Sequence, residues 1–140
     1  MNIAIRYYTK TGNTKKICEA MGEAIGVEAK SIDVPLDEKV DVLFLGNSVY
    51  AANIDPKVKH FIGANVDKIG CLVNVSSAAL LNSTYSSMCG LCKALNIPIS
   101  GSEFHTKGEF KFMHKGRPNA EDLKAAADFA KSLVGEPNKE

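Results

Sequence analysis

The residues whose types and spacing best suit chemistry form one hexapeptide near the start of the chain. In order, they are Thr9, Lys10, Thr11, Gly12, Asn13 and Thr14. Three threonine hydroxyls can donate to one tetrahedral anion, and a glycine lets the backbone approach it closely. A helical pattern follows, and the amides of a helix start also favour an anion. The pattern predicts a phosphate-binding turn, and the alternative is an ordinary capped turn between strand and helix.

The hexapeptide differs from two common phosphate loops. It is no Walker A loop, because no Gly-Lys-Ser/Thr follows, and it lacks the Gly-x-Gly-x-x-Gly of dinucleotide-binding turns. It resembles the phosphate loop of flavodoxins, in which Ser/Thr-x-Thr-Gly-x-Thr follows the first strand. The resemblance implies that the hexapeptide binds the phosphate of FMN.

The elements around this turn alternate along the chain. Strands are predicted at residues 2–9, 27–34, 40–46, 71–75 and 97–104. Helices are predicted at residues 14–25, from Asp55-Pro56 onward, around Met88, and after Asn119, which can form a capping box with Asp122. Strands thus alternate with helices five times, which predicts an α/β fold with a doubly wound parallel sheet and helices on both faces. The resemblance to short-chain flavodoxins implies five strands in the order 2-1-3-4-5 and a single domain over residues 1–140.

Three predicted loops should meet at the carboxyl ends of the strands, where such sheets bind ligands. They are residues 9–14, 47–55 and 76–87. In the family, the second and third loops hold the flavin ring. The implied contacts are Ser48, Val49, Tyr50, Ala51 and Asn53 in the second loop, and Ser76, Ser77, Ala78 and Tyr85 in the third. Tyr50 is expected to stack on the ring, Tyr85 to cover its other face, and the backbone of residues 76–78 to bind its polar edge.

Composition limits the other classes. The chain has 140 residues with 45% hydrophobic content, which suits one domain, and no apolar run approaches the ~20 residues of a membrane span. We therefore expect a cytoplasmic protein with reduced cysteines and no membrane insertion. A net charge of +1 gives no support to nucleic-acid binding.

The charge also departs from the acidic electron-carrier flavodoxins. The predicted rim of the site carries Lys10, Lys15, Lys16, Lys57 and Lys59 against Asp55. A positive rim favours a reduced, anionic flavin, so we expect a less negative redox couple than in the acidic carriers. The second loop also lacks the glycine that flavodoxins often carry there.

Cysteine and histidine offer weaker alternatives. Cys89 and Cys92 have the spacing of a redox dithiol, although Cys92 also fits the apolar stripe of a helix. The histidines are expected at the surface, and none lies in a recognisable nucleophile arrangement. We expect no metal site and no catalytic side chain.

These observations favour an FMN-binding electron carrier that acts between redox partner proteins, a reductase and an acceptor. One alternative is a flavodoxin-like NAD(P)H or quinone oxidoreductase. A third hypothesis is a cofactor-free interaction module on the same fold.

Overall fold

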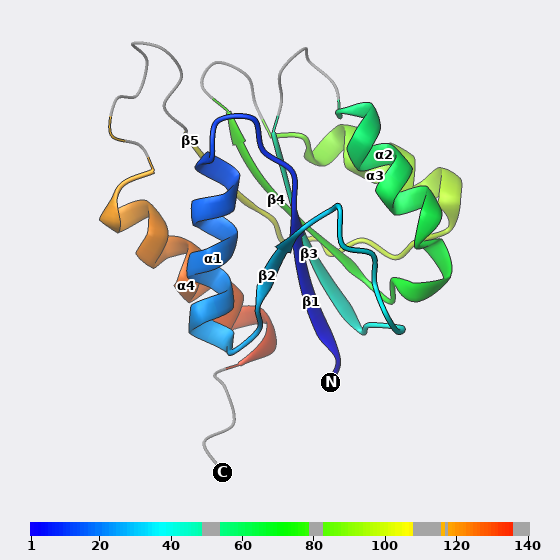
Figure 1. Cartoon of the computed structure of the whole chain (residues 1–140), viewed down its shortest axis with the longest axis horizontal. Helices are drawn as coiled ribbons and strands as arrows, with labels where there is room; N and C mark the ends of the chain where they lie inside the picture. Colours follow the sequence, from blue (N-terminus) through cyan, green and yellow to red (C-terminus); the bar gives the residue numbers. More distant parts are fainter. Residues whose placement is uncertain (49–53, 79–82, 108–115, 117, 136–140) are drawn as a thin grey trace.

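The computed structural model describes residues 1–48, 54–78, 83–107, 116 and 118–135 (Figure 1). The strands are β1 (Ile3–Tyr7), β2 (Ala29–Ser31), β3 (Val42–Ser48), β4 (Leu72–Ala78) and β5 (Phe104–Lys107). The helices are α1 (Asn13–Ile25), α2 (Pro56–Ala64), α3 (Tyr85–Leu95) and α4 (Ala120–Val134), with a 3-10 turn at Val66–Lys68.

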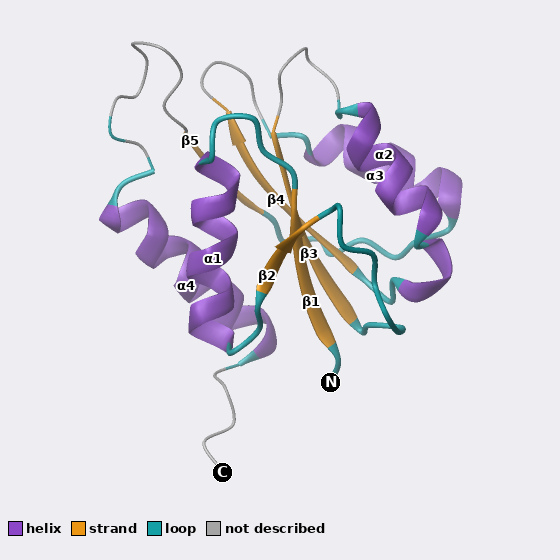
Figure 2. Cartoon of the chain, in the orientation of Figure 1, coloured by secondary structure: helices purple, strands orange, loops and turns teal. Residues whose placement is uncertain are grey.

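The five strands form one parallel sheet in the order β2-β1-β3-β4-β5, as predicted. Helices α1 and α4 cover one face and α2 and α3 the other, so the sheet is doubly wound (Figure 2). Alternate residues of β3 enter opposite cores, with Phe44 on the α1 side and Leu45 on the α2 side. Polar side chains near the ends of β3 and β4 are sorted onto two faces in the same way.

Helix α1 packs unusually close to β3. A Cβ atom on Gly46 would lie 2.5 Å from Cys18 Sγ and 2.6 Å from Thr14 Cγ2. Any side chain at position 46 would therefore push the first turns of α1 away from the sheet. The glycine sets the depth at which Thr14 sits against the strand ends.

The sequence prediction placed the starts of two loops, at residues 47 and 76, too early in the chain. Asn47 and Ser48 belong to β3, and residues 76–78 belong to β4, while α3 begins at Tyr85. The parallel ladder continues through these polar residues, which pair as Asn47 with Ser76 and Ser48 with Ser77. Their side chains are buried with polar partners, so their polarity does not end the strands.

The last strand was predicted wrongly at residues 97–104. Strand β5 begins at Phe104, and Ile99 makes an isolated bridge with Leu72. Ile97 completes the stop of α3 instead, since Asn96 adopts a left-handed conformation and Ile97 N–H donates to Cys92 O. The apolar residue after such a stop packs on the helix, and here it mimicked a strand in the sequence.

The connection from β2 to β3 contains no helix, so the alternation of strands with helices fails there. Residues 32–41, all of them described, form turns and bends with one isolated bridge, from Val40 to Ile69. The buried Arg6 on β1 binds this segment, since its guanidinium donates to Val34 O at 2.8 Å and Pro35 O at 3.2 Å. Burial lowers the pKa of Arg6. Arg6 thus satisfies carbonyls that a helix would satisfy internally.

Candidate functional site

The three predicted cofactor segments meet in a ring of hydroxyl groups. Thr14 Oγ1 lies 2.7 Å from Ser48 Oγ and 3.1 Å from Ser77 Oγ, and the two serine oxygens are 3.4 Å apart. Thr14 comes from α1, Ser48 from the end of β3 and Ser77 from the end of β4. The structure therefore brings together one residue from each segment, and we call this set the hydroxyl ring.

The hydroxyl ring is closed and buried. Thr14 is 0% exposed, and Ser48 and Ser77 are also buried. Three hydroxyls have three hydrogens, which suffice for the three contacts. Thr14 therefore serves as a link between the segments in this structure rather than as an outward donor.

The N-terminus of α1 is the part of the hexapeptide that remains open to an anion. Gly12 lies before the helix with φ of 88°, which favours glycine, and no described side chain caps the helix start. Thr9 Oγ1 accepts from Gly12 N–H at 2.9 Å, which keeps its own hydrogen for another acceptor. Thr11 is exposed and Asn13 is buried. The first and second threonines, with the uncapped amides, are the groups that could bind a phosphate.

A second contact joins the hexapeptide to α2. Lys10 Nζ lies 3.8 Å from Asp55 Oδ2. Asp55 also caps α2 as predicted, because its Oδ1 accepts from Lys57 N–H at 2.8 Å. Lys57 Nζ lies 5.7 Å from the centre of the Tyr8 ring. The lysines beside the turn are thus held by an acid and by an aromatic face.

On the α2 and α3 side, buried amides link the ends of β3 and β4. Asn47 Nδ2 donates to Asn74 Oδ1 at 2.9 Å, and Asn74 Nδ2 donates to Thr84 Oγ1 at 3.0 Å. Asn47 is 1% exposed, yet its Oδ1 has no hydrogen-bond partner among the described residues. A buried acceptor without a donor is costly, and this one lies just before residues 49–53.

Beside the third segment lies a histidine of β5, His105, whose contact with that segment was not predicted from the sequence. His105 Nδ1 lies 2.8 Å from Ser76 Oγ, which lies 3.4 Å from Ser83 Oγ. Ser83 Oγ donates to Glu103 Oε1 and accepts from Tyr85 N–H at 3.0 Å. The histidines were expected at the surface and outside any recognisable nucleophile arrangement; His105 is half-buried, and the fold brings it within hydrogen-bond distance of a serine. The pairing of β4 with β5 brings it to Ser76, which is 29 positions away.

The two predicted stacking tyrosines differ in what the structure says of them. Tyr85 begins α3, and its hydroxyl donates to Ser100 O at 2.8 Å. The nearby Cys89 thiol raises the pKa of Tyr85 through a hydrogen bond, with a smaller contribution from burial. The predicted contacts Val49, Tyr50, Ala51 and Asn53 lie outside the described residues. Ala78 ends β4. Stacking by either tyrosine stays a prediction.

All four cysteines are free thiols. Cys92 lies in the core, and burial raises its pKa to about 11. Burial likewise raises the pKa of Cys18 to about 12. A thiol with so high a pKa is a poor nucleophile at neutral pH, so Cys92 is better explained by packing than by dithiol chemistry.

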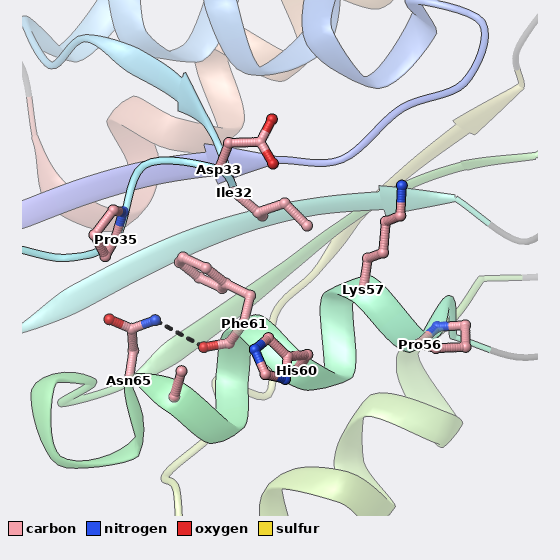
Figure 3. Close-up of a pocket in the computed structure, with 9 residues that line it drawn as sticks. Ile32, Asp33, Pro35, Pro56, Lys57, His60, Phe61 and Asn65 are labelled. Carbon is pink, nitrogen blue, oxygen red and sulfur yellow. Dashed lines mark hydrogen bonds between the residues drawn. The ribbon is translucent and has the colours of Figure 1, made fainter.

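A groove of about 570 Å³ lies apart from these clusters, between the β2–β3 connection and α2 (Figure 3). Phe61 lies along its floor, with Asp33 and Lys57 on opposite sides. None of the predicted cofactor contacts lines it. The groove lies beside the connection that lacks a helix.

Within the described residues, no helix is both long and apolar enough to cross a membrane. A family model described as a flavodoxin domain matches residues 4–84. An uncharacterized protein of Methanocaldococcus jannaschii is 24% identical over 135 residues, which cover 87% of this chain and 90% of that protein.

Solved structures match over nearly the whole chain. A flavodoxin from the domain Archaea has a TM-score of 0.72 and 18% identity, and the match covers 96% of this chain and 99% of that chain. Oxidised flavodoxin 1 from Bacillus cereus has a TM-score of 0.73 and 14% identity, over 96% of this chain and 97% of that chain. At these identities the structural matches establish the fold.

Proposed function

Because the chain belongs to the flavodoxin family, we propose that it binds FMN at the carboxyl ends of β1, β3 and β4 and carries electrons between redox proteins. The observation that carries this proposal is the uncapped start of α1 behind Gly12. The starts of α2 and α4 are closed by Asp55 and by the Asn119 capping box. The start of α3 at Thr84 also has no side-chain cap, so α1 is selected by its open start together with its place directly behind the family's phosphate motif.

The residues present fit such a ligand. Thr9, Thr11 and the first amides of α1 would hold the phosphate, and the hydroxyl ring would keep α1 in register with the two neighbouring strand ends. The backbone after Ser76 and the unpaired Asn47 Oδ1 offer polar groups for the rest of the cofactor. When bound, FMN supplies the capacity to accept and release electrons, which hydroxyl and amide side chains do not have.

The charged residues around the site should shift the reduction potential of bound FMN. Lys15 and Lys16 are exposed in the first turns of α1, whereas Lys10 is offset by Asp55. Positive charge beside a site favours the reduced, more negative cofactor. The proposed carrier therefore has a less negative couple than acidic flavodoxins, which a redox titration of the FMN complex would test.

Titration of the purified, cofactor-stripped protein with FMN and with riboflavin tests the phosphate contact directly. Riboflavin is the matched ligand because it differs by the phosphate alone. We expect FMN to bind roughly a hundredfold more tightly, since charge-assisted hydrogen bonds to one group contribute about 1.5–3 kcal/mol each. Thr11→Ala should weaken FMN binding and leave riboflavin binding unchanged. Equal affinities for the two ligands would contradict the proposal.

Which reductant can reduce the bound flavin distinguishes an electron carrier from an oxidoreductase enzyme. A carrier's bound flavin should be bleached by dithionite, or by NADPH when a reductase is added. Bleaching by NAD(P)H with the protein alone would support the enzyme instead. Absence of flavin binding at high excess would support the cofactor-free module.

A further inference from the structure

Four lysines are exposed at the starts of two helices. Lys15 and Lys16 lie in the first turn of α1, and Lys57 and Lys59 lie in the first turn of α2. Both helices begin at the end of the molecule where β1 and β3 finish (Figure 1). We call these four side chains the lysine rim.

The lysine rim is unfavourable for the helices that carry it. The N-terminus of a helix has a partial positive charge, which favours Asp and Glu there and disfavours Lys. Neither α1 nor α2 has an acidic residue in its first turn. Helix α4 has the ordinary arrangement, with Glu121 and Asp122 in its first turn and Lys131 in its last. The lysine rim therefore costs helix stability, and a negatively charged partner would offset this cost.

The acidic residue closest to the rim in the sequence is already engaged. Asp55 accepts from Lys57 N–H at 2.8 Å as the cap of α2, and it lies 3.8 Å from Lys10 Nζ. This ion pair also joins the turn before α1 to the start of α2, so both halves of the rim lie at one edge. In the part of the chain that the structure describes, none of the four rim lysines forms an ion pair. Their charge is thus available to another molecule.

The arrangement of the rim suits a protein surface better than a small anion. Helices α1 and α2 cover opposite faces of the sheet, so their lysines spread over a broad edge rather than surround one point (Figure 2). The net charge of the whole chain is only +1, so the positive charge is local and gives no support to binding a long polyanion such as nucleic acid.

We propose that the lysine rim is the docking surface for an acidic redox protein. The inference rests on the proposed function for the kind of partner, because the rim borders the strand ends where we propose that the cofactor binds. Complementary charge speeds association and orients the partner toward this edge. Since the lysines are exposed, the attraction is screened by salt, which suits a partner that must also leave.

Binding of an acidic plant-type ferredoxin to the cofactor-free protein tests this surface, with a basic cytochrome c as the probe of opposite charge. We expect ferredoxin to bind at about 20 mM salt and to bind at least tenfold more weakly at about 200 mM. Amide NMR shifts should change in the first turns of α1 and α2. Tighter binding of cytochrome c, or no ferredoxin binding at low salt, would overturn the proposal.

Charge reversal locates the contact. Lys57→Glu combined with Lys59→Glu should weaken ferredoxin binding roughly tenfold at low salt, and the corresponding double reversal in α1 should do the same. The matched control combines Lys39→Glu with Lys93→Glu, two exposed lysines at the opposite end, before β3 and in the last turn of α3. It changes the net charge equally and should alter binding by less than about twofold. Equal weakening by the control would overturn the docking surface.

FMN titration of the same variants separates docking from cofactor binding. The double reversal in α2 should leave FMN affinity within about threefold of the wild type, because exposed charges are screened by salt. A tenfold loss of FMN affinity with unchanged ferredoxin binding would mean that the lysines serve the cofactor, and the docking surface would be wrong. Failure of the wild type to bind FMN would overturn the proposed function, and with it the redox nature of the partner, whereas the ferredoxin measurement decides the acidic docking surface by itself.

Discussion

Adjacent serines of β4 enter two hydrogen-bonded clusters of opposite character. Ser77 faces α1 and belongs to the hydroxyl ring, which is closed, neutral and buried. Ser76 faces α3 and belongs to a row of hydrogen-bonded side chains, here called the His–Glu chain, that runs from His105 through Ser76 and Ser83 to Glu103. The same residue type therefore contributes a neutral joint on one face and a link to two ionisable side chains on the other.

The difference follows from the period of the strand. Neighbouring residues point to opposite faces, so each serine meets the partners that another element supplies. Helix α1 supplies a threonine through the close approach at Gly46, whereas β5 supplies a histidine. We therefore expect variants of the hydroxyl ring and variants of the His–Glu chain to act through separate sets of contacts.

The largest effect should come from Gly46→Ala, which tests the close approach of α1 to β3 on which the hydroxyl ring depends. The added methyl group would lie 2.5 Å from Cys18 Sγ and 2.6 Å from Thr14 Cγ2. Overpacking of this kind costs about 1–3 kcal/mol or more, and it would also separate Thr14 from the serines. Denaturant unfolding should show a loss near the upper end of this range.

Gly63→Ala in α2 is the matched control for Gly46→Ala. A Cβ atom at Gly63 meets nothing within 4 Å, so the exchange should raise stability by about 0.5–1 kcal/mol through helix propensity. Equal effects of the two substitutions would contradict the close approach of α1 to β3.

Thr14→Val tests the ring itself, because it removes a hydroxyl and keeps the shape. Ser48 and Ser77 would keep only their mutual 3.4 Å contact. Loss of a buried hydrogen-bond partner costs about 1–3 kcal/mol, and the loss should be constant between pH 5 and pH 8. Thr11→Val, the same change at an exposed position, should stay within about 0.5 kcal/mol of the wild type. An unchanged stability for Thr14→Val would contradict the idea that the hydroxyl ring holds α1 to the ends of β3 and β4.

Whether a cluster could be predicted from the sequence depends on how far apart its members lie along the chain. The Asn119–Asp122 capping box and the glycine turn before α1 are local patterns, and both were predicted. The Ser76–His105 pair joins positions 29 residues apart, and nothing in either local sequence indicates it. Asn47, Ser48, Ser76 and Ser77 were predicted in loops because polar residues rarely continue a buried strand. Their partners lie on other elements, which a single sequence does not pair.

The buried thiol of Cys18 on α1 should make the stability of the fold depend on pH in the alkaline range. Burial, with a smaller effect of Glu19, raises its pKa to about 12. The thiol of the unfolded chain ionises first, near pH 8.5, so its contribution to stability is complete below that pH and is lost as pH rises toward 12. The slope should be about 1.4 kcal/mol per pH unit for this group. Cys18→Ala should have a shallower alkaline slope in denaturant titrations from pH 8 to 11, and an unchanged slope would contradict the burial.

The smallest effect is a coupling energy, and it distinguishes a chain from a set of separate contacts. Ser83 and His105 share Ser76 as a partner without bonding to each other in any described contact. A double-mutant cycle of Ser83→Ala and His105→Ala should therefore show about 0.5 kcal/mol of coupling, because either change alone leaves Ser76 with one bond fewer. The cycle of Ser77→Ala with His105→Ala should be additive within about 0.3 kcal/mol, since Ser77 bonds to the ring instead. Equal coupling in the two cycles would mean that both faces of β4 respond as one unit, and the contrast between joint and link would be lost.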